Sequence, residues 1–212
     1  AKSPGAAVPA ALEEREEGPA DVAAAANVSA PAVAENAAAM AEEEAEPPAP
    51  PPAWTVQPGG HIRFSVDNGG ETISGGFSKW TARIRIDPDH PDTADIRVEI
   101  DLASASVGDA YQNGMLAGEE FFGISAHPRA IFTAKGAERT RAGRYRAAGT
   151  LSLKGVSRPQ AIRFALSGSG KTRAVSGTAT IARLPFGVGT GDSAAGLAPR
   201  VTVTFAFDAR AD

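Results

Sequence analysis

The run Gly149-Thr-Leu-Ser-Leu-Lys-Gly-Val-Ser-Arg-Pro159 contains the clearest strand and turn pattern of this chain. Leu151 and Leu153 alternate with polar residues up to a Lys-Gly pair, and the run from Ile162 to Leu166 alternates again behind it. Alternation with a period of two indicates a half-buried strand, and a glycine-containing pair between two such runs indicates a tight turn. The two runs therefore predict antiparallel strands that share one apolar face.

The same alternation recurs along most of the chain. It predicts about eight strands, at residues 62–67, 83–86, 96–102, 130–139, 144–153, 162–166, 174–184 and 201–208. Turn-forming residues separate these runs, as in Asp67-Asn68-Gly69-Gly70, Asp87-Pro88-Asp89 and Ala142-Gly143. A closed antiparallel sheet of about eight strands has an interior just wide enough for side chains or one slender ligand. We therefore predict an all-β fold, an eight-stranded antiparallel β-barrel.

One segment, residues 107–122, lacks the alternation. Its apolar residues recur at the three-to-four spacing of a helix, at Ala110, Tyr111, Met115, Leu116 and Ala117. This spacing predicts a short helix that ends near Gly118 and covers one mouth of the barrel.

The first 53 residues differ in composition from the rest. They contain nine of the 16 prolines and no Phe, Trp or Tyr, so they have little apolar surface to offset the entropy of ordering. Their net charge is −8, which leaves +4 for residues 54–212. We predict a disordered Ala/Pro/Glu-rich linker or tail over residues 1–53 and one folded domain over residues 54–212.

Several classes of site lack support in the sequence. Basic residues occur singly along the predicted strands, which is typical of a solvated face and not of a nucleic-acid footprint. The chain has no cysteine, and His61, His90 and His127 have no metal-ligand spacing. The pair Glu119-Glu120 is the nearest approach to an acid–base pair, and no nucleophile or histidine accompanies it. We expect no catalytic residues, no metal site and no enzymatic activity.

Short motifs throughout residues 54–212 resemble the YceI-like family, periplasmic polyisoprenoid-binding proteins with a lipocalin-like barrel. Gly149-x-Leu151-x-Leu153-x-Gly155-Val156 followed by Pro159 is the most characteristic of them. The others are Gly76-Phe77, Ile86-Asp87-Pro88, Leu102-Ala103-Ser104, Leu116 with Glu120-Phe121-Phe122, the run from Pro128 to Phe132, and Arg183-x-x-Phe186-Gly187-Val188-Gly189.

The resemblance implies a function. The ligand would be an isoprenoid-type lipid, a polyisoprenoid or an isoprenoid quinone, held along the barrel axis for transport, storage or protection, with no other cofactor. The resemblance also implies a periplasmic or extracytoplasmic location. Some family members are fused to a cytochrome b-type membrane domain, so a membrane domain or membrane protein upstream of the linker is a second expected partner.

The inward positions of the predicted strands and the aromatic motifs supply the candidate lipid-binding residues. They are Phe64, Val66, Phe77, Ile100, Leu116, Phe121, Phe122, Phe132, Leu151, Leu153, Phe164, Phe186, Val203 and Phe205. Small residues at inward positions favour a cavity over a filled core: Ala147, Gly149, Gly177 and Ala179.

Three alternatives remain open from the sequence. Arg183 either meets a polar head group or donates to loop carbonyls. Trp80, Phe121 and Phe122 either form an apolar collar at the entrance or are ordinary packing, which is the better interpretation for Trp80. The whole domain is either a lipid-binding barrel or a β-rich structural or interaction module with a solid core, and a hydrolase that uses the loops at the barrel mouth is a third hypothesis.

Overall fold

A computed structural model describes residues 49–212 of the chain. Most of the predicted linker, residues 1–48, lies outside the described residues. The folded domain begins slightly before the predicted boundary, because strand β1 starts at Ala53 and the carbonyl of Pro52 accepts a hydrogen bond from Ile86 N at 3.2 Å.

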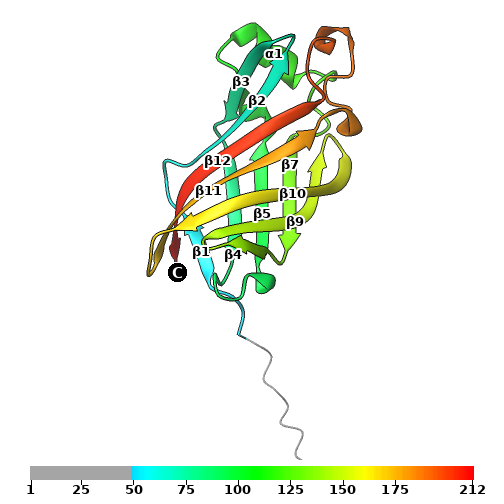
Figure 1. The fold of residues 1–212 in the computed structure, drawn as a ribbon. Helices are drawn as coiled ribbons and strands as arrows, with labels where there is room; N and C mark the ends of the chain where they lie inside the picture. The colour runs from blue at the N-terminus through cyan, green and yellow to red at the C-terminus, as the bar shows by residue number, and fades with distance from the viewer. Residues whose placement is uncertain (1–48) are drawn as a thin grey trace, which may run out of the picture. The chain divides into compact units, whose positions relative to one another are not determined.

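The domain is a succession of strands with one short α-helix (Figure 1). The strands are β1 Ala53–Val56, β2 His61–Asn68, β3 Glu71–Phe77, β4 Trp80–Arg85, β5 Asp95–Asp101, β6 Ala105–Ser106, β7 Arg129–Lys135, β8 Glu138–Arg141, β9 Arg144–Leu153, β10 Val156–Ser167, β11 Thr172–Ala182 and β12 Arg200–Ala211. The helix α1 spans Ala110–Ala117, and short 3-10 turns lie at Pro91–Thr93, Leu102–Ser104, Leu184–Phe186 and Asp192–Ala194.

Several of these strands are the two halves of one interrupted strand. Along β12, Trp54 of β1 pairs with Ala211 and His61 of β2 pairs with Ala206, so β1 and β2 follow the same neighbour on either side of a short break. In the same way β3 continues into β4, β5 into β6, and β7 into β8. Counted as continuous strands, the sheet is a closed antiparallel barrel of eight. The fold predicted from the alternation is confirmed.

The turn between β9 and β10 follows the Lys-Gly prediction. Leu153 pairs with Val156, and the two residues between them have left-handed backbone, with φ of 50° at Lys154 and 74° at Gly155. A two-residue turn of this hand matches the twist of the strands it joins. The turn also places the Lys154 side chain at the end of the barrel, where it contacts the loops described below.

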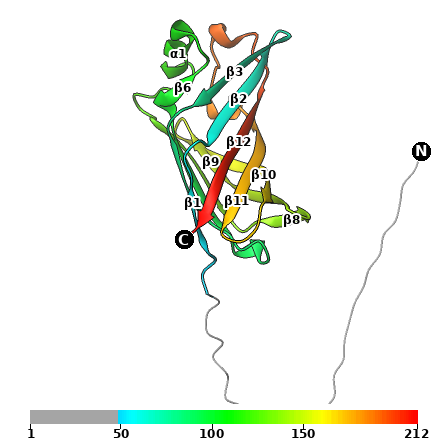
Figure 2. The same ribbon diagram turned by 90° about the vertical axis from the view of Figure 1, so that its left-hand side faces the viewer.

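One end of the barrel carries a cap, which we define as α1, residues 118–127 and residues 184–198. Figure 2 shows α1 and the orange segment that contains residues 184–198 at the same end, with β1 and the C-terminus at the other. The Asp109 carboxylate begins the helix by accepting from Gln112 N at 2.8 Å, and Gly118 ends it. The predicted helix at one mouth is therefore present.

Charged side chains lie on the outer face of the sheet, as the alternation predicts. On β5 the carboxylate of Glu99 accepts from Arg97 at 2.8 Å and from Arg129 of β7 at 3.3 Å. The hydrogen bond from Arg97 lowers the pKa of Glu99, with a smaller charge contribution from Arg129. Because the charged residues of these strands point outward, the apolar residues that alternate with them point into the barrel.

Candidate apolar interior

The inner face of the barrel encloses two adjoining cavities. The far-end cavity lies away from the cap and has a volume of about 130 Å³, and the cap-end cavity has a volume of about 140 Å³. Four residues line both of them: Ile100, Leu151, Ile181 and Val203. The two cavities are therefore parts of one apolar interior that runs along the barrel.

Most of the residues predicted to contact a lipid line this interior. Those on the cap-end cavity alone are Phe64, Val66, Phe77, Leu116, Phe121, Phe122 and Leu153. Those on the far-end cavity alone are Phe132, Phe164 and Phe205, while Ile100, Leu151 and Val203 face both. The fold thus brings together side chains from seven of the barrel's eight strands.

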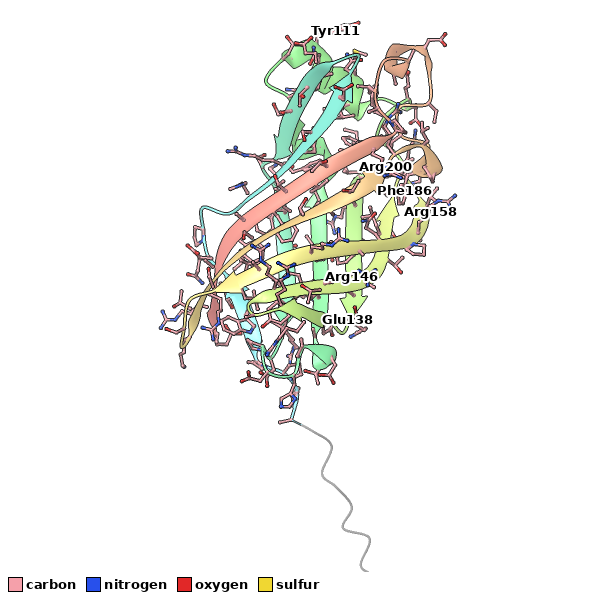
Figure 3. The ribbon with its side chains drawn as sticks, viewed as in Figure 1. Tyr111, Glu138, Arg146, Arg158, Phe186 and Arg200 are labelled. Atoms are coloured by element: carbon pink, nitrogen blue, oxygen red, sulfur yellow. The ribbon has the colours of Figure 1, made fainter. Side chains whose placement is uncertain are left out.

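Phe186 is the exception among them. It is buried, with 4% of its surface exposed, but it lines neither cavity. It lies in the cap beside Arg158 of β10 (Figure 3), whose Nε donates to the neighbouring carbonyl of Pro185 at 2.9 Å. Phe186 packs the cap against the barrel wall and is not part of the interior surface.

Some of the large inward side chains are only partly buried. Ile100, Val203 and Phe205 are half-buried although they point inward, because each faces open space. Within residues 49–212, no large side chain has less than 2% of its surface exposed. A solid core of this size would enclose some large side chains completely, since protein interiors pack with few voids. The interior is therefore hollow.

Sequence reasoning missed part of the lining. The far-end cavity is also lined by Ile62, Trp80, Ala82, Ile84, Ile86, Ile96, Val98, Ile162, Leu166, Val175 and Phe207, among others. Most of these occupy the apolar phase of a predicted strand, so the alternation that placed Ile100 inward also contained the signal for them.

The sequence suggested that the small inward residues leave open space inside the barrel. Not all of them do. Ala179 lines the far-end cavity, but the ring of Phe205 covers Gly177 from the neighbouring strand. A Cβ on Gly177 would lie 2.2 Å from Phe205 Cζ and 2.6 Å from the carbonyl oxygen of Arg163. Gly149 is similarly closed, because a Cβ there would lie 2.1 Å from the Thr133 carbonyl oxygen. These glycines permit close approach and do not widen the cavity.

Arg183 does not present its guanidinium to a head group. Its side chain is buried, and its nitrogens donate to five backbone carbonyls of the cap, those of Val188, Gly189, Ala194, Leu197 and Ala198. Burial lowers the pKa of the guanidinium from its ordinary value. Arg183 lines the cap-end cavity, but its donors are used by the loop, which is the second of the two roles that the sequence left open.

Trp80 does not form one collar with the two cap phenylalanines. Phe121 and Phe122 line the cap-end cavity, whereas Trp80 lines the far-end cavity and packs its ring on Phe207, with centroids 5.5 Å apart. Trp80 lies in the barrel wall, at the first residue of β4.

Two cationic side chains hold the cap together. Besides Arg183, Lys154 donates from Nζ to the carbonyl of Glu119 and, at 2.7 Å, to that of Gly187. It therefore joins residues 118–127 to residues 184–198. The backbone adds a direct link between the same segments, from Gly189 N to the carbonyl of Glu120 at 2.7 Å.

Residues 49–212 contain no group of three or more His, Asp or Glu side chains arranged to hold a metal ion. The described part of the chain also contains no helix long and apolar enough to cross a membrane.

A family model described as the YceI-like domain matches residues 54–209. The chain belongs to the YceI-like domain family. The match covers the whole barrel from β1 into β12, and it contains every residue of both cavities.

Solved structures agree with this assignment. The YceI-like barrel is similar to BcnA of Burkholderia cenocepacia, with 25% identity and a TM-score of 0.66 over 70% of this chain and 95% of that one. It has the fold of the Campylobacter jejuni YCEI protein, with 23% identity and a TM-score of 0.61 over 66% and 85% of the two chains. It also has the fold of a Saccharophagus degradans domain described as polyisoprenoid-binding, with 15% identity and a TM-score of 0.60 over 76% and 99%. A comparison with curated proteins found no match.

The interior of this YceI-like barrel offers mainly apolar contact. The surface that faces both cavities is apolar, the guanidinium of Arg183 is already bonded to carbonyls, and the other polar lining residues are Gln160 and Arg173 of the far-end cavity. Burying a hydrocarbon against such a surface lowers the free energy by about 25 cal/mol for each Å² of apolar surface removed from water.

Proposed function

We propose that this YceI-like domain binds an isoprenoid-type lipid, a polyisoprenoid or an isoprenoid quinone, inside its barrel. The observation that carries the proposal is the pair of apolar cavities that adjoin along the barrel, at Ile100, Leu151, Ile181 and Val203. Two apolar cavities that follow one another along the barrel suit a slender hydrocarbon chain better than a compact ligand, which would occupy one cavity and leave the other empty.

The volumes indicate how much chain the interior holds as it stands. An apolar cavity of about 150 Å³ accepts one benzene molecule, so the two cavities together have room for about a dozen carbon atoms. A longer prenyl chain has to displace half-buried side chains such as Phe205 and Ile100, or leave part of its length outside the barrel. Half-buried side chains move at lower cost than those of a solid core.

The family supports the same ligand class. The Saccharophagus degradans domain of the same fold is described as polyisoprenoid-binding. The resemblance is also the support for three further parts of the proposal: that the domain carries, stores or protects the lipid without catalysis, that it acts in the periplasm or another extracytoplasmic space, and that a membrane domain or membrane protein is its neighbour. Cell fractionation of the native host with an antibody to the barrel tests the location.

Binding can be measured with the protein's own fluorescence. Both tryptophans, Trp54 and Trp80, line the far-end cavity. A short-tailed ubiquinone that enters the barrel therefore quenches the tryptophan emission, and the titration gives its dissociation constant. Organic extraction of the purified protein followed by mass spectrometry identifies any lipid that it carries from the cell.

A cavity-filling variant tests the site. Ala179→Phe adds a ring to the far-end cavity, and we expect it to weaken ubiquinone binding by about tenfold or more, since the added ring takes the volume of several chain carbons. Ala174→Phe is the matched control, because Ala174 lies on the same strand and is exposed.

The outcomes separate the binding barrel from the solid-core module. If the parent protein carries no prenyl lipid and does not bind the ubiquinone, and if Ala179→Phe only destabilises the fold through overpacking, of about 1–3 kcal/mol, the solid-core module replaces the proposal.

A further inference from the structure

The barrel wall is incomplete between β1 and β4. Within the described residues, these strands pair only at Ala53 with Arg85 and at Trp54 with Ile84. Continued along the strands, the same register would set Thr55 opposite Arg83 and Val56 opposite Ala82, but neither pair forms. Each strand keeps its other neighbour, β12 for β1 and β5 for β4.

A cleft of about 630 Å³ occupies this gap. Residues of both faces of the sheet line it: the inward residues Trp54, Val56, Trp80, Ala82 and Ile84, and the outward residues Thr55, Thr81, Arg83 and Arg85. Successive residues of a strand point to opposite faces, so a cleft lined by consecutive residues of two unpaired strand segments lies in the wall itself.

The cleft adjoins the far-end cavity of the barrel. Trp54, Trp80, Ala82 and Ile84 line both. The β1–β4 pairing closes one end of the gap. At the other end the indole of Trp80 lies against the backbone of Gly60, where an added Cβ would be 2.9 Å from Trp80 Cζ2. Gly60 thus leaves room for the indole at the junction between the cleft and the interior.

We propose that the gap between β1 and β4 is a lateral portal through which a prenyl chain enters and leaves the barrel. The inference rests on the proposed function and adds the route. The portal has apolar residues on its inner side, next to the interior, while Arg83, Arg85 and Asp212 form its outer rim. A chain can pass the apolar part while its polar head stays in water at the charged rim.

Two other entry routes are conceivable, through the cap and through a second break in the wall, but contacts hold each of them closed. The cap is held by the side-chain bonds of Arg183 and Lys154 to several carbonyls. A second break in the wall lies between β10 and β11, which pair only from Arg163 to Ser167 on the β10 side. There the side chain of Gln160 donates to the carbonyl of Thr180 at 3.1 Å and bridges the break.

Cross-linking tests the three routes separately, because the chain has no cysteine of its own. Thr55→Cys with Arg83→Cys closes the portal at two outward positions. Ala161→Cys with Thr180→Cys closes the second break in the same manner. Glu120→Cys with Gly191→Cys locks the cap, where a Cβ on Gly191 would lie 3.0 Å from Glu120 Cγ. Each pair is joined with a short reducible bis-methanethiosulfonate reagent.

The readout is the rate at which tryptophan emission falls after mixing with vesicles of phosphatidylcholine that contain the short-tailed ubiquinone. We expect the portal cross-link to slow uptake by about tenfold or more, reduction of the linker to restore the rate, and the final level of quenching to be unchanged. The other two cross-links should leave the rate within about twofold of the parent, which is under 0.5 kcal/mol of barrier.

Other outcomes overturn the proposal. Unchanged uptake through a fully cross-linked portal contradicts it, and slow uptake on locking the cap or the second break assigns the route to that place. If the protein without any cross-link binds no ubiquinone at equilibrium, the proposed function fails and not the route.

Discussion

Arg183 shows how one side chain can organise a whole loop. Its position continues the inward phase of β11, after Val175, Ala179 and Ile181, so the alternation turns it toward the interior. The carbonyls of residues 188–198 then surround the guanidinium. A buried charge is tolerated because its donors are all engaged.

Replacing Arg183 with Met removes these donors but keeps much of the side-chain volume. We expect the free energy of unfolding to fall by about 2–4 kcal/mol, since several buried carbonyls lose their partners together. Chemical denaturation measures the change. Arg163→Met, at an exposed position of β10, is the control and should change stability by less than about 0.5 kcal/mol.

Binding separates the two possible roles of Arg183. If Arg183→Met folds with the parent's stability yet discriminates differently between a prenyl alcohol and a prenyl phosphate, the side chain meets the head group and the structural role is wrong.

For single residues, the sequence predicted which face of the sheet a side chain points to better than it predicted which atoms that side chain contacts. The inward position of Arg183 follows from the period of two, and so do those of Leu151 and Phe205. The partners of Arg183 lie five to fifteen residues later in a loop without periodicity, so no local pattern could choose between a head group and carbonyls. Gly177 presents the same limit, because the Phe205 ring that covers it comes from another strand.

Among the elements, the cap depends on contacts between loops more than on the helix. The helix α1 has no buried residue, and its Tyr111 is 78% exposed and points away from the barrel (Figure 3). Lys154 connects the two other parts of the cap, and the left-handed turn directs it there.

Replacing Lys154 with Met should loosen the cap while the barrel stays intact. The carbonyls of Glu119 and Gly187 lose their shared donor, so the two segments separate more often. We expect hydrogen exchange to become faster at Gly189, whose amide bonds to Glu120, and to stay slow in β9 and β11. The control is Lys135→Met, which removes an exposed ion pair to Asp95 on the outer face. Equal acceleration in the strands and the cap would show that Lys154 stabilises the domain as a whole.

Most strands of the barrel could be predicted because their residues alternate over six or more positions. Strands β3 and β1 are among those that could not be predicted in this way. Strand β3 has Gly75 and Gly76 in its interior, and glycine is depleted in strands. Strand β1 has only four residues and follows a proline run, so it has too few positions to show a period. The breaks at residues 57–60 and 78–79 were also invisible, and they are where the wall opens.

For the whole molecule, the hollow interior means that ligand and stability are linked. An empty apolar cavity forgoes the packing contacts that a filled core would have. A chain inside the barrel supplies them, and a ligand that binds only the folded state stabilises it by mass action.

The free energy of unfolding should therefore rise with lipid concentration. At about 100-fold excess over the dissociation constant the expected gain is about 2.7 kcal/mol. Chemical denaturation of delipidated protein with and without the short-tailed ubiquinone measures it. Ala179→Phe should show a smaller gain at the same concentration, and an equal gain in this variant would place the ligand outside the far-end cavity.

The pairing of β1 with β12 also has a consequence for how the domain folds. Trp54 meets Ala211, almost at opposite ends of the described residues, so the barrel becomes a ring only when segments far apart in sequence come together. Such distant pairings form slowly because the loop entropy precedes their gain. We call the pairing of β1 and β2 with β12 the seam of the barrel. Strand β1 is the shorter part of this seam, because it has four residues and pairs with β4 at only two of them. Native-state hydrogen exchange should therefore find β1 opening at a lower free energy than β9 or β11, so that the seam is the last part of the barrel to close and the first to yield.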